Sequence, residues 1–575
     1  MESVMRPGRI RRINGPLVEV RDVPDTAMYE VLELGELRIP AEVVAIRGGT
    51  CTLQAFEYTG GLRVGDTVHR TGRPLSARLG PGLLGQVFDG LLRPLSTAPT
   101  WLSPQQLVSE EPTADRWHFV PGVEQGNQVR PGTVLGVVTG SGAIDHRVLV
   151  PPGVSGELRF LADAGKVPAA ATVARVGEVE VGLFEQWPVR RPRPFERREE
   201  TFVPLHTGQR VLDLLFPIGA GSTTAVPGGF GTGKTVLLQQ LAKWCDADVI
   251  VYVGCGERGN EMADVLGELA ELADPRTGGR MIDRTVILAN TSNMPMMARE
   301  ASVFTAVTVA EYFRDMGYHA VVVADSTSRW AEALREFASR TGALPAEEGY
   351  PADLSSALAA FYERAGRVRT QGGYVAAVTV VGAVSPPGGD LTEPVTTATE
   401  RFVRGVWSLD RDLAYARHYP AVSWAASYSH DVAAVGAWHA GHGNTGWAAR
   451  RARAMTLLAE AARLTELAEI VGTRTLPGRE RMTILGGRLL RDTVLAQSAL
   501  SAVDASCTIE RGAELLQLVL DVVDRCMTLV DRGVAATELE EFDFGALIRA
   551  REEAPEQADL ERCRAEILTA LEALP

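Results

Sequence analysis

Short runs of alternating apolar and polar residues, broken by glycine, proline and aspartate, fill the first 75 positions of the chain. Residues 16–20 read PLVEV, and residues 41–46 read AEVVAI. A period of two is typical of half-buried β-strands, and closely spaced turns indicate a small barrel. We therefore predict an N-terminal β-barrel over residues 1–75, followed by a connection over residues 76–105.

The pattern changes three more times along the chain. Residues 106–190 again show strands and turns, as in GTVLGVV at 132–138, and predict an inserted β domain. Over residues 191–435, apolar strands alternate with helical patterns, which indicates a largely parallel α/β sheet. From residue 436 to 575 the pattern is helical, proline is scarce, and no heptad repeat is sustained, so we predict a C-terminal helical domain.

The octapeptide GGFGTGKT at residues 228–235 fits the pattern of a phosphate-binding loop. It follows a short predicted strand at 222–226 and precedes a predicted helix at 235–244. In this arrangement, backbone N–H groups and a helix N-terminus converge on phosphate. We expect a nucleotide to be held here by Gly228, Gly229, Phe230, Gly231, Thr232, Gly233, Lys234, Thr235 and Val236.

Lys234 is one of only three lysines in the 575-residue chain, which otherwise uses arginine for positive charge. A compact ammonium on a flexible stem suits a position between the β- and γ-phosphates of a nucleotide. The rarity of lysine therefore supports a functional role for Lys234.

Composition limits the classes of partner. The formal net charge of −14 argues against general nucleic-acid binding, which needs basic surfaces. The six cysteines contain no CxxC pair or metal-ligand spacing, so we expect a reduced, intracellular setting. No apolar run has membrane-spanning length and the N-terminus has no signal-like apolar segment, so any membrane connection is expected to run through partner subunits.

A carboxylate follows the next predicted strand, VIVYV at 249–253. Because ligands of open parallel sheets lie beyond the carboxyl ends of the strands, we expect Glu257 to project from the edge where Lys234 lies. There it could polarise the water that attacks the γ-phosphate, while Arg258 contacts phosphate or orients the acid. Glu261 is the alternative base, but it falls about one helical turn later and suits local pairing better.

Asp325 ends a second apolar run, AVVVAD at 320–325. An acid at this kind of strand terminus fits the group that holds Mg²⁺, usually through water, and Thr235 would supply a direct hydroxyl ligand. We therefore expect Mg²⁺ to enter together with ATP or ADP.

These strings together resemble the catalytic A subunit family of V-type rotary ATPases, including the archaeal and bacterial forms. Among the most specific are GCGERGNE at 254–261 and ADSTSRWAEA at 324–333. LGPGLLG at 79–85, WPVR at 187–190 and FYERAG at 361–366 also match, so the resemblance covers most of the chain. It implies a RecA-like P-loop nucleotide-binding domain within the multidomain plan described above.

The resemblance also implies roles and partners. Lys234 and Thr235 fall on the phosphate and magnesium positions, Glu257 on the general base, and Arg258 on a phosphate contact. Such subunits alternate in a ring with a non-catalytic B subunit, which supplies an arginine finger in trans. Central-shaft and peripheral-stalk subunits complete the complex at the cytoplasmic face of the membrane, where proton or sodium-ion transport is coupled to ATP hydrolysis or synthesis.

Several positions depart from the family pattern. Gly229 stands where proline is common, and Thr232 stands where eukaryotic relatives have a redox-sensitive cysteine. Leu500 takes the expected place of an aromatic side chain that packs on adenine, whereas Tyr419 fits the other wall of the base pocket. The resemblance therefore implies a looser base pocket.

Three alternatives remain beside this assignment. A Rho-type nucleic-acid translocase shares the barrel-plus-sheet plan, but the acidic charge and the lack of basic residues interleaved with aromatics oppose it. An F-type-like or secretion ATPase is another. A regulatory, non-hydrolysing subunit is the third, and the joint presence of Lys234, Thr235 and Glu257 argues against it.

Overall fold

The computed structural model describes residues 8–95, 116–342 and 344–574. The expected boundary between the connection and the inserted domain, at residues 105–106, lies outside these residues. The chain forms two compact units. Unit 1 comprises Met1–Glu200, Ala247–Ser385 and Thr392–Phe402, and unit 2 comprises Thr201–Asp246, Pro386–Leu391 and Val403–Pro575.

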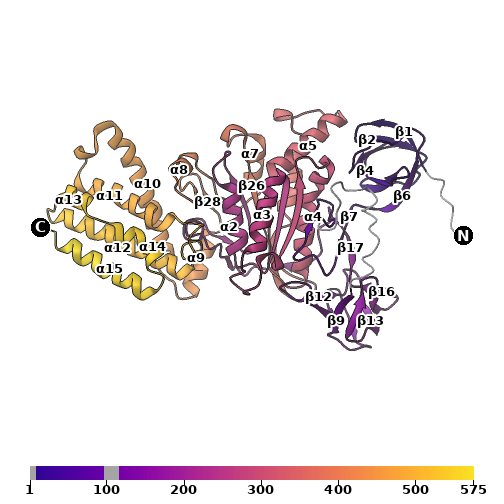
Figure 1. Ribbon diagram of the computed structural model, residues 1–575, viewed down its shortest axis with the longest axis horizontal. Coiled ribbons are helices and arrows are strands. Elements are labelled where there is room, and N and C mark those ends of the chain that lie inside the picture. The colour runs from indigo at the N-terminus through magenta and orange to yellow at the C-terminus, as the bar shows by residue number, and fades with distance from the viewer. Residues whose placement is uncertain (1–7, 96–115, 343, 575) are drawn as a thin grey trace. The chain divides into compact units, whose positions relative to one another are not determined.

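Unit 1 begins with a closed barrel of strand order β1-β2-β5-β4-β3-β6, which confirms the predicted N-terminal barrel (Figure 1). Alternation sets its inside: Val18 and Val20 are fully buried in the barrel core, whereas Arg21 beside them is exposed. The barrel strands are β1 (Gly8–Asn14), β2 (Leu17–Arg21), β3 (Glu30–Leu34), β4 (Ile39–Arg47), β5 (Thr50–Ala55) and β6 (Thr67–Pro74).

The predicted inserted β domain consists of two four-stranded sheets, ordered β10-β13-β15-β16 and β12-β11-β9-β14. Leu135 and Leu158, one from each sheet, are fully buried in a shared apolar cluster. The strands are β9 (Arg116–Pro121), β10 (Gln128–Val129), β11 (Val134–Thr139), β12 (His146–Leu149), β13 (Gly156–Leu161), β14 (Gly165–Pro168), β15 (Thr172–Val176) and β16 (Val179–Gly182).

A parallel sheet of order β26-β24-β22-β23-β8 forms the centre of unit 1. Its strands are almost continuously apolar, as expected where both faces are covered. The strands are β8 (Val87–Phe88), β22 (Val249–Glu257), β23 (Thr285–Thr291), β24 (Ala320–Asp325) and β26 (Val375–Val384). The surrounding helices are α3 (Gly259–Glu271), α4 (Met296–Asp315), α5 (Thr327–Thr341), α6 (Leu354–Tyr362) and α7 (Pro394–Glu400).

Two short antiparallel pairings complete unit 1. One joins β7 (Ser76–Leu79) to β17 (Glu185–Pro188), on either side of the inserted domain in the sequence. The other joins β18 (Arg197–Arg198) to β25 (Gly366–Arg369), which also pairs with β26. The chain therefore leaves the connecting segment and returns from the inserted domain at neighbouring points.

Helix α4 packs on β22, β23, β24 and β26, and nearly all of its residues are buried, including several that carry charge. Arg190 lies between two carboxylates: it donates to Glu300 of α4 at 2.7 and 2.8 Å and to Glu42 of the barrel at 3.0 Å. Arg364 donates to Glu311, one of the most deeply buried residues of α4, at 2.8 Å. These pairs compensate charges that would otherwise be costly to remove from water.

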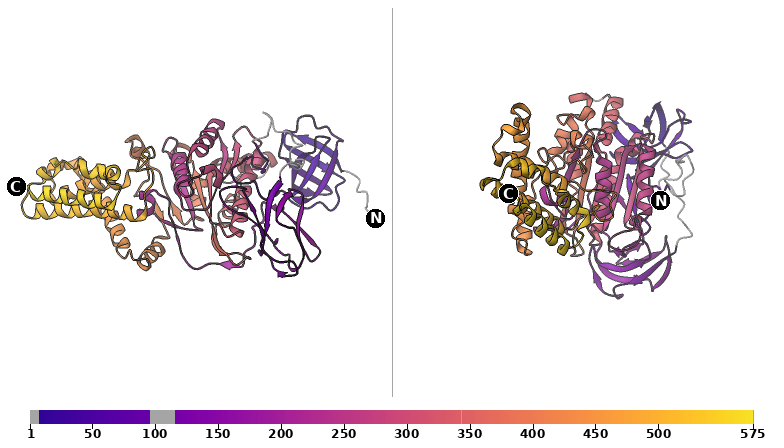
Figure 2. Two further views of the ribbon diagram at one scale, coloured as in Figure 1. Left: turned by 60° about the horizontal axis from the view of Figure 1, so that its bottom comes forward. Right: turned by 60° about the vertical axis from the view of Figure 1, so that its left-hand side comes forward.

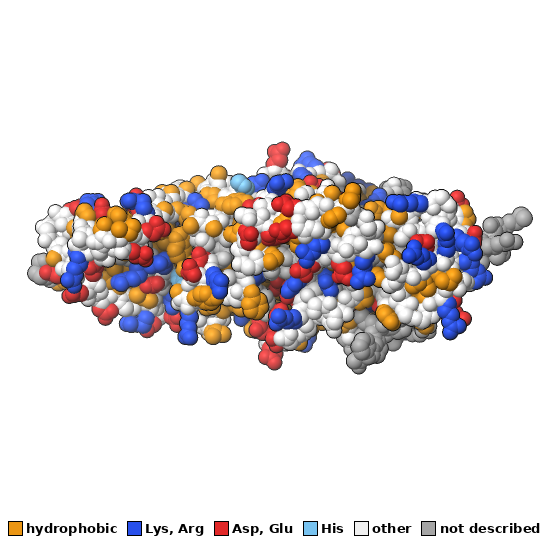
Figure 3. Space-filling model, turned by 90° about the horizontal axis from the view of Figure 1, so that it is seen from above, with side chains coloured by type: hydrophobic (Ala, Val, Ile, Leu, Met, Phe, Trp, Pro, Cys, Tyr) orange, Lys and Arg blue, Asp and Glu red, His pale blue; other side chains and the backbone are white. Residues whose placement is uncertain are grey.

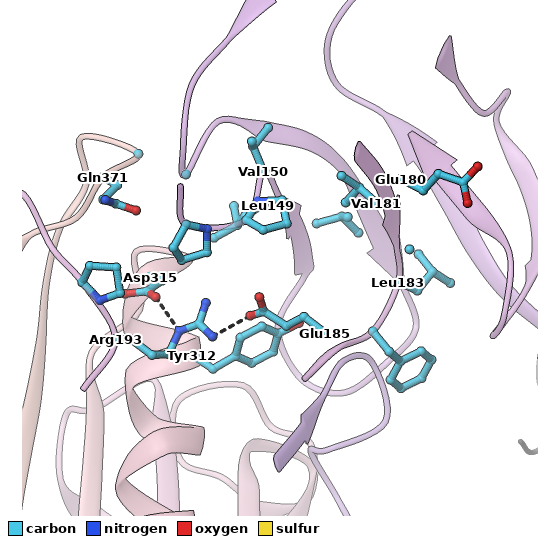
Figure 4. Close-up of a pocket in the computed structure, with 18 residues that line it drawn as sticks. Leu149, Val150, Glu180, Val181, Leu183, Glu185, Arg193, Tyr312, Asp315 and Gln371 are labelled. Atoms are coloured by element: carbon cyan, nitrogen blue, oxygen red, sulfur yellow. Dashed lines mark hydrogen bonds and ion pairs between the residues drawn. The ribbon is translucent and has the colours of Figure 1, made fainter. Parts of the chain in front are cut away.

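A similar cluster surrounds Arg193, which lines a cavity of about 230 Å³ beside the inserted domain (Figure 4). Its Nε donates to Asp315 at 2.7 Å, and its Nη1 lies 2.6 Å from a carboxylate oxygen of Glu185. Beside it, Tyr312 shares a 3.0 Å hydrogen bond with His146 of β12. The inserted domain is therefore attached to the C-terminal end of α4 by buried polar contacts.

Unit 2 contains the predicted strand and helix around the phosphate loop and, from α10 onward, the predicted C-terminal helical domain (Figure 2). Its strands are β19 (Pro204–Leu205), β20 (Ile218–Gly219), β21 (Thr223–Pro227), β27 (Gly405–Val406) and β28 (Tyr428–Ser429). Its helices are α1 (Arg210–Leu215), α2 (Lys234–Trp244), α8 (Arg411–Tyr415), α9 (Val432–Gly441), α10 (Trp447–Val471), α11 (Gly478–Leu490), α12 (Ile509–Asp531), α13 (Ala536–Glu541), α14 (Gly545–Glu553) and α15 (Gln557–Glu572).

Arg210 of α1 is buried against the segment that precedes α12. Its Nη1 lies 2.6 Å from Asp504, and its Nε donates to the carbonyl of Val494 at 2.7 Å. Its Nη2 donates to the carbonyl of Ala496 at 2.6 Å. Both ionic partners are almost fully buried, so this pair links segments nearly three hundred positions apart in the chain.

The surface carries charges of both signs, interspersed with apolar side chains over the face in Figure 3. Among the described residues, none of the helices combines the length and the apolar character needed to cross a lipid bilayer.

We expect Asp504→Ala to lower the free energy of unfolding of unit 2 by about 3–5 kcal/mol, because it leaves Arg210 buried without its ionic partner. Loss of helical circular dichroism in urea measures this change. Asp531→Ala is the matched control: it breaks an exposed pair with Arg479 and should cost only about 0–1 kcal/mol. Equal costs for the two variants would contradict the assigned importance of the buried pair.

Candidate active site

The phosphate loop of unit 2 connects β21 to α2, and three of its glycines are required by geometry. Gly231 and Gly233 have φ values of +80° and +87°, a region that L side chains rarely adopt. A Cβ at Gly228 would lie 2.8 Å from Thr232 Oγ1 and 2.9 Å from Leu409 Cβ. At Gly229, by contrast, a Cβ would meet only Gly389 Cα, at 3.6 Å. Space therefore does not require the glycine at position 229.

Lys234 begins α2, and its side chain folds back over the loop. The ammonium Nζ donates to the carbonyls of Gly228 and Gly229 at 2.6 and 2.8 Å. Thr232 closes the same loop by donating from Oγ1 to the carbonyl of Gly229 at 2.8 Å. The positive charge thus lies within the loop at a helix N-terminus, where an anion is favoured. Phe230 is 90% exposed, and Val236 is also exposed.

Tyr419 lies beside the loop, as expected for one wall of a base pocket. A Cβ on Gly233 would be 3.5 Å from the Tyr419 ring, whose hydroxyl donates to the carbonyl of Ala414 at 3.3 Å. The Tyr419 carbonyl accepts a 2.8 Å bond from the N–H of Gln497, three residues before Leu500. Leu500 itself is 98% exposed. Tyr419 is thus fixed at both ends, whereas Leu500 presents its side chain to solvent.

The acidic residues lie in unit 1, at the carboxyl ends of its parallel strands. Glu257 ends β22 just after a bulge: Cys255 pairs with Asn290 and Glu257 pairs with Thr291, so Gly256 is the extra residue. Gly256 has a φ of +81°. A bulge at this place redirects the following side chain.

The pKa of Glu257 is raised to about 7. Burial is the main cause, and the negative charge of Asp325 and the hydrogen bond and charge of Glu261 add to it. The guanidinium of Arg329 on α5 opposes the rise. A carboxyl group that titrates near neutral pH is suited to accept and release a proton during turnover.

Asp325 is buried at the end of β24, and Gly254 of the adjacent strand β22 is its pairing partner. The Tyr252 hydroxyl donates to Asp325 Oδ2 at 3.2 Å. Burial, and then the charge of Asp325, raise the pKa of Tyr252 well above its usual value, so the phenol keeps its proton and remains a donor.

Arg258 and Glu261 lie at the start of α3, directly after the acid. The Arg258 side chain is largely exposed, and its Nη1 lies 3.9 Å from Glu261 Oε1. Water screens a pair of this kind strongly. Cys255, by contrast, is fully buried, and burial raises the pKa of its thiol to about 12.

The expected site residues thus form two groups. Unit 2 holds the phosphate loop with Lys234, Thr235 and Tyr419, and unit 1 holds Glu257, Arg258 and Asp325. Sequence reasoning did not identify Tyr252, which is hidden within an apolar run. It did not assign a role to Arg329 either, although Arg329 follows Asp325 by about one helical turn.

Comparison with known families gives consistent matches along the chain. The nucleotide-binding domain of the ATP synthase alpha/beta family matches residues 208–429, and its beta-barrel domain matches residues 10–72. The barrel-sandwich domain of ATP synthase alpha/beta subunits matches residues 111–190. The C-terminal domain of V and A type ATP synthase matches residues 436–538.

Among solved structures, the assembled ATPase EscN from the type III secretion system of enteropathogenic E. coli is similar, with a TM-score of 0.63. It is 22% identical and covers 89% of this chain and 100% of its own, a likeness of fold alone.

Relatives by sequence are far more similar. The V-type ATP synthase alpha chain of Nitrosococcus oceani is 47% identical over 95% of this chain and 93% of its own length. The corresponding A-type ATP synthase protein of Thermococcus onnurineus is 47% identical over 92% and 93%, respectively. The V-type ATP synthase alpha chain of Anaeromyxobacter dehalogenans is 48% identical over 94% of each chain. With this identity along nearly its whole length, the chain belongs to the family of V-type and A-type ATP synthase alpha (A) subunits.

Proposed function

We propose that this chain is the catalytic subunit of a V-type rotary ATPase, which hydrolyses or synthesises ATP coupled to rotation and to proton or sodium-ion transport. The observation that carries the proposal is Glu257, a carboxyl group with a pKa of about 7 at the end of a parallel strand, next to the strand that ends in Asp325. Membership of the ATP synthase family supports the same assignment.

In this proposal, the phosphate loop binds the phosphates through its N–H groups, and the Lys234 ammonium reaches the β- and γ-phosphates. The Thr235 hydroxyl and the Asp325 carboxylate offer the oxygen ligands that Mg²⁺ prefers, the latter through water. When bound with the nucleotide, Mg²⁺ supplies neutralisation of the charge on the phosphate oxygens. Asp325 is held in place for this role by the hydroxyl of Tyr252.

Glu257 orients the attacking water and accepts its proton, which requires the ionised carboxylate. Arg258 is placed next to this acid in the chain, and its long exposed side chain can turn from Glu261 to a phosphate oxygen. Tyr419 forms one wall of the adenine site, and Leu500 offers no aromatic face for the other, so the base is held less tightly than the phosphates.

We further propose that the arginine finger comes from a neighbouring non-catalytic B subunit, because family members work in multisubunit complexes. A finger supplied in trans contributes roughly 10³- to 10⁵-fold in rate, so the isolated chain should be a poor ATPase. The C-terminal helical domain would contact the central shaft, and the inserted domain would face the peripheral stalk. The chain would lie at the cytoplasmic face of the membrane through these partners and bind no nucleic acid.

Copurification distinguishes this assignment from a secretion ATPase or a Rho-type translocase. The chain should bring down a B-type subunit of similar size together with shaft subunits. An active homohexamer, or turnover stimulated by RNA, would favour one of the alternatives.

We expect Glu257→Gln to lower kcat of the assembled complex by about 10²- to 10⁴-fold, because the amide keeps the shape of the side chain but cannot accept a proton. MgATP binding should be retained, since the phosphate loop is unchanged. Single-turnover ATP hydrolysis and binding of a fluorescent nucleotide measure the two quantities. Full ATPase activity in this variant would refute the proposed base.

The pH dependence of kcat/KM should show an acid limb near pH 7, because only the ionised form of Glu257 acts as a base in the free enzyme. Glu261→Gln removes a negative charge that raises the pKa of Glu257 and alters the hydrogen bond that does the same. The variant should therefore lower that pKa and move the acid limb to lower pH. Stopped-flow rates across a pH series measure the shift.

Glu268→Gln is the matched control, because Glu268 is exposed about two turns further along α3. Its acid limb should coincide with that of the unmodified protein. An identical shift in both variants would point to a general effect of charge rather than to Glu261.

A further inference from the structure

The bulge before Glu257 is covered by an arginine, Arg299, that belongs to none of the groups described above. An atom at the Cβ position of Gly256 would lie 2.9 Å from both Cδ and Nε of Arg299 and 3.3 Å from its Cζ. The guanidinium stem of Arg299 therefore lies directly against the Cα of Gly256. Any residue other than glycine at position 256 would displace it.

Arg299 also reaches the chain that follows the neighbouring strand. Its Nη2 donates to the carbonyl of Ser292 at 2.9 Å, and the N–H of Ser292 donates to the carbonyl of Glu257 at 3.0 Å. Ser292 comes directly after β23, so Arg299 and Ser292 together connect the ends of β22 and β23. The backbone of Glu257 is thereby held on one side by a hydrogen bond and on the other by the filled bulge.

The origin of Arg299 makes this support rigid. It lies in the first turn of α4, and its N–H donates to the carbonyl of Pro295 at 3.2 Å. Its own carbonyl accepts a 2.7 Å bond from Ser302, whose Oγ is also 3.7 Å from the thiol of Cys255. The Nε of Arg299 is buried and has no hydrogen-bond partner among the described residues, so the flat guanidinium is used for contact as well as for hydrogen bonding.

We propose that Arg299 is a positioning residue for Glu257: it fills the space over the Gly256 bulge and, through Ser292, fixes the backbone that aims the Glu257 carboxyl group. This inference rests on the proposed function of Glu257. A planar guanidinium suits the task better than an ammonium, because it can pack flat against a peptide while donating from its edge.

The test uses the assembled complex. Arg299→Met keeps much of the stem but loses the plane and the donor, and kcat should fall roughly 10- to 100-fold, as expected for a displaced catalytic group. KM for MgATP should change much less, because Arg299 does not belong to the phosphate loop. Arg299→Lys keeps the charge and should lose nearly as much kcat as Arg299→Met.

Chemical rescue separates positioning from general damage to the fold. Arg299→Ala should regain part of its kcat when guanidinium ion is added at non-denaturing concentration, whereas the same concentration of sodium chloride should have no effect. Arg340→Met is the control variant: Arg340 is an exposed arginine on α5 that pairs with Glu336, and its loss should leave kcat unchanged.

Unchanged kcat in Arg299→Met would overturn the inference, and so would failure of all three Arg299 variants to assemble, which would assign Arg299 to folding alone. Glu257→Gln, measured in parallel, separates the two proposals. If Glu257→Gln stays active, the proposed function fails; if it is inactive while Arg299→Met is fully active, only the role of Arg299 fails.

Discussion

The compensation of buried charge on α4 is the constraint on which the rest of unit 1 depends. A helix packed inside a protein cannot leave acids such as Glu311 unpaired, because an isolated buried charge is costly. The buried acids of α4 are met by arginines from other parts of the chain, and these contacts fix where the barrel, the inserted domain and the sheet meet the helix. The arginines concerned are Arg190, Arg193 and Arg364.

The same helix connects two places with different roles. Its first turn carries Arg299, which supports the strand end bearing Glu257, and its last turn carries Tyr312 and Asp315, which hold the inserted domain. A displacement of α4 along its axis would thus be felt at both ends. Because its middle is packed against the central strands, the helix can transmit such a displacement with little bending.

Local pattern was enough to predict the four-part architecture, the phosphate loop and the strand ends that carry Glu257 and Asp325, since these depend on periodicity and on short motifs. It could not predict which arginine pairs with which acid: Arg190 and Glu42 are 148 positions apart, and only the fold brings them together. Nor could it predict the bulge at Gly256, because an extra residue in one strand is defined by its register against another. Tyr252 was missed for a related reason, as its hydroxyl has meaning only beside Asp325.

The scarcity of lysine has a practical consequence for chemical labelling. Besides Lys234, the side-chain amines are Lys166 on a strand of the inserted domain and Lys243, whose ammonium lies over the ring of Trp244. Cleavage at arginine places Lys166 in a peptide of its own, and further cleavage at the leucines between Lys234 and Lys243 separates those two. Mass spectrometry of a chain treated with an amine-directed reagent can then read occupancy of the phosphate loop against two internal reference amines, without any engineered label.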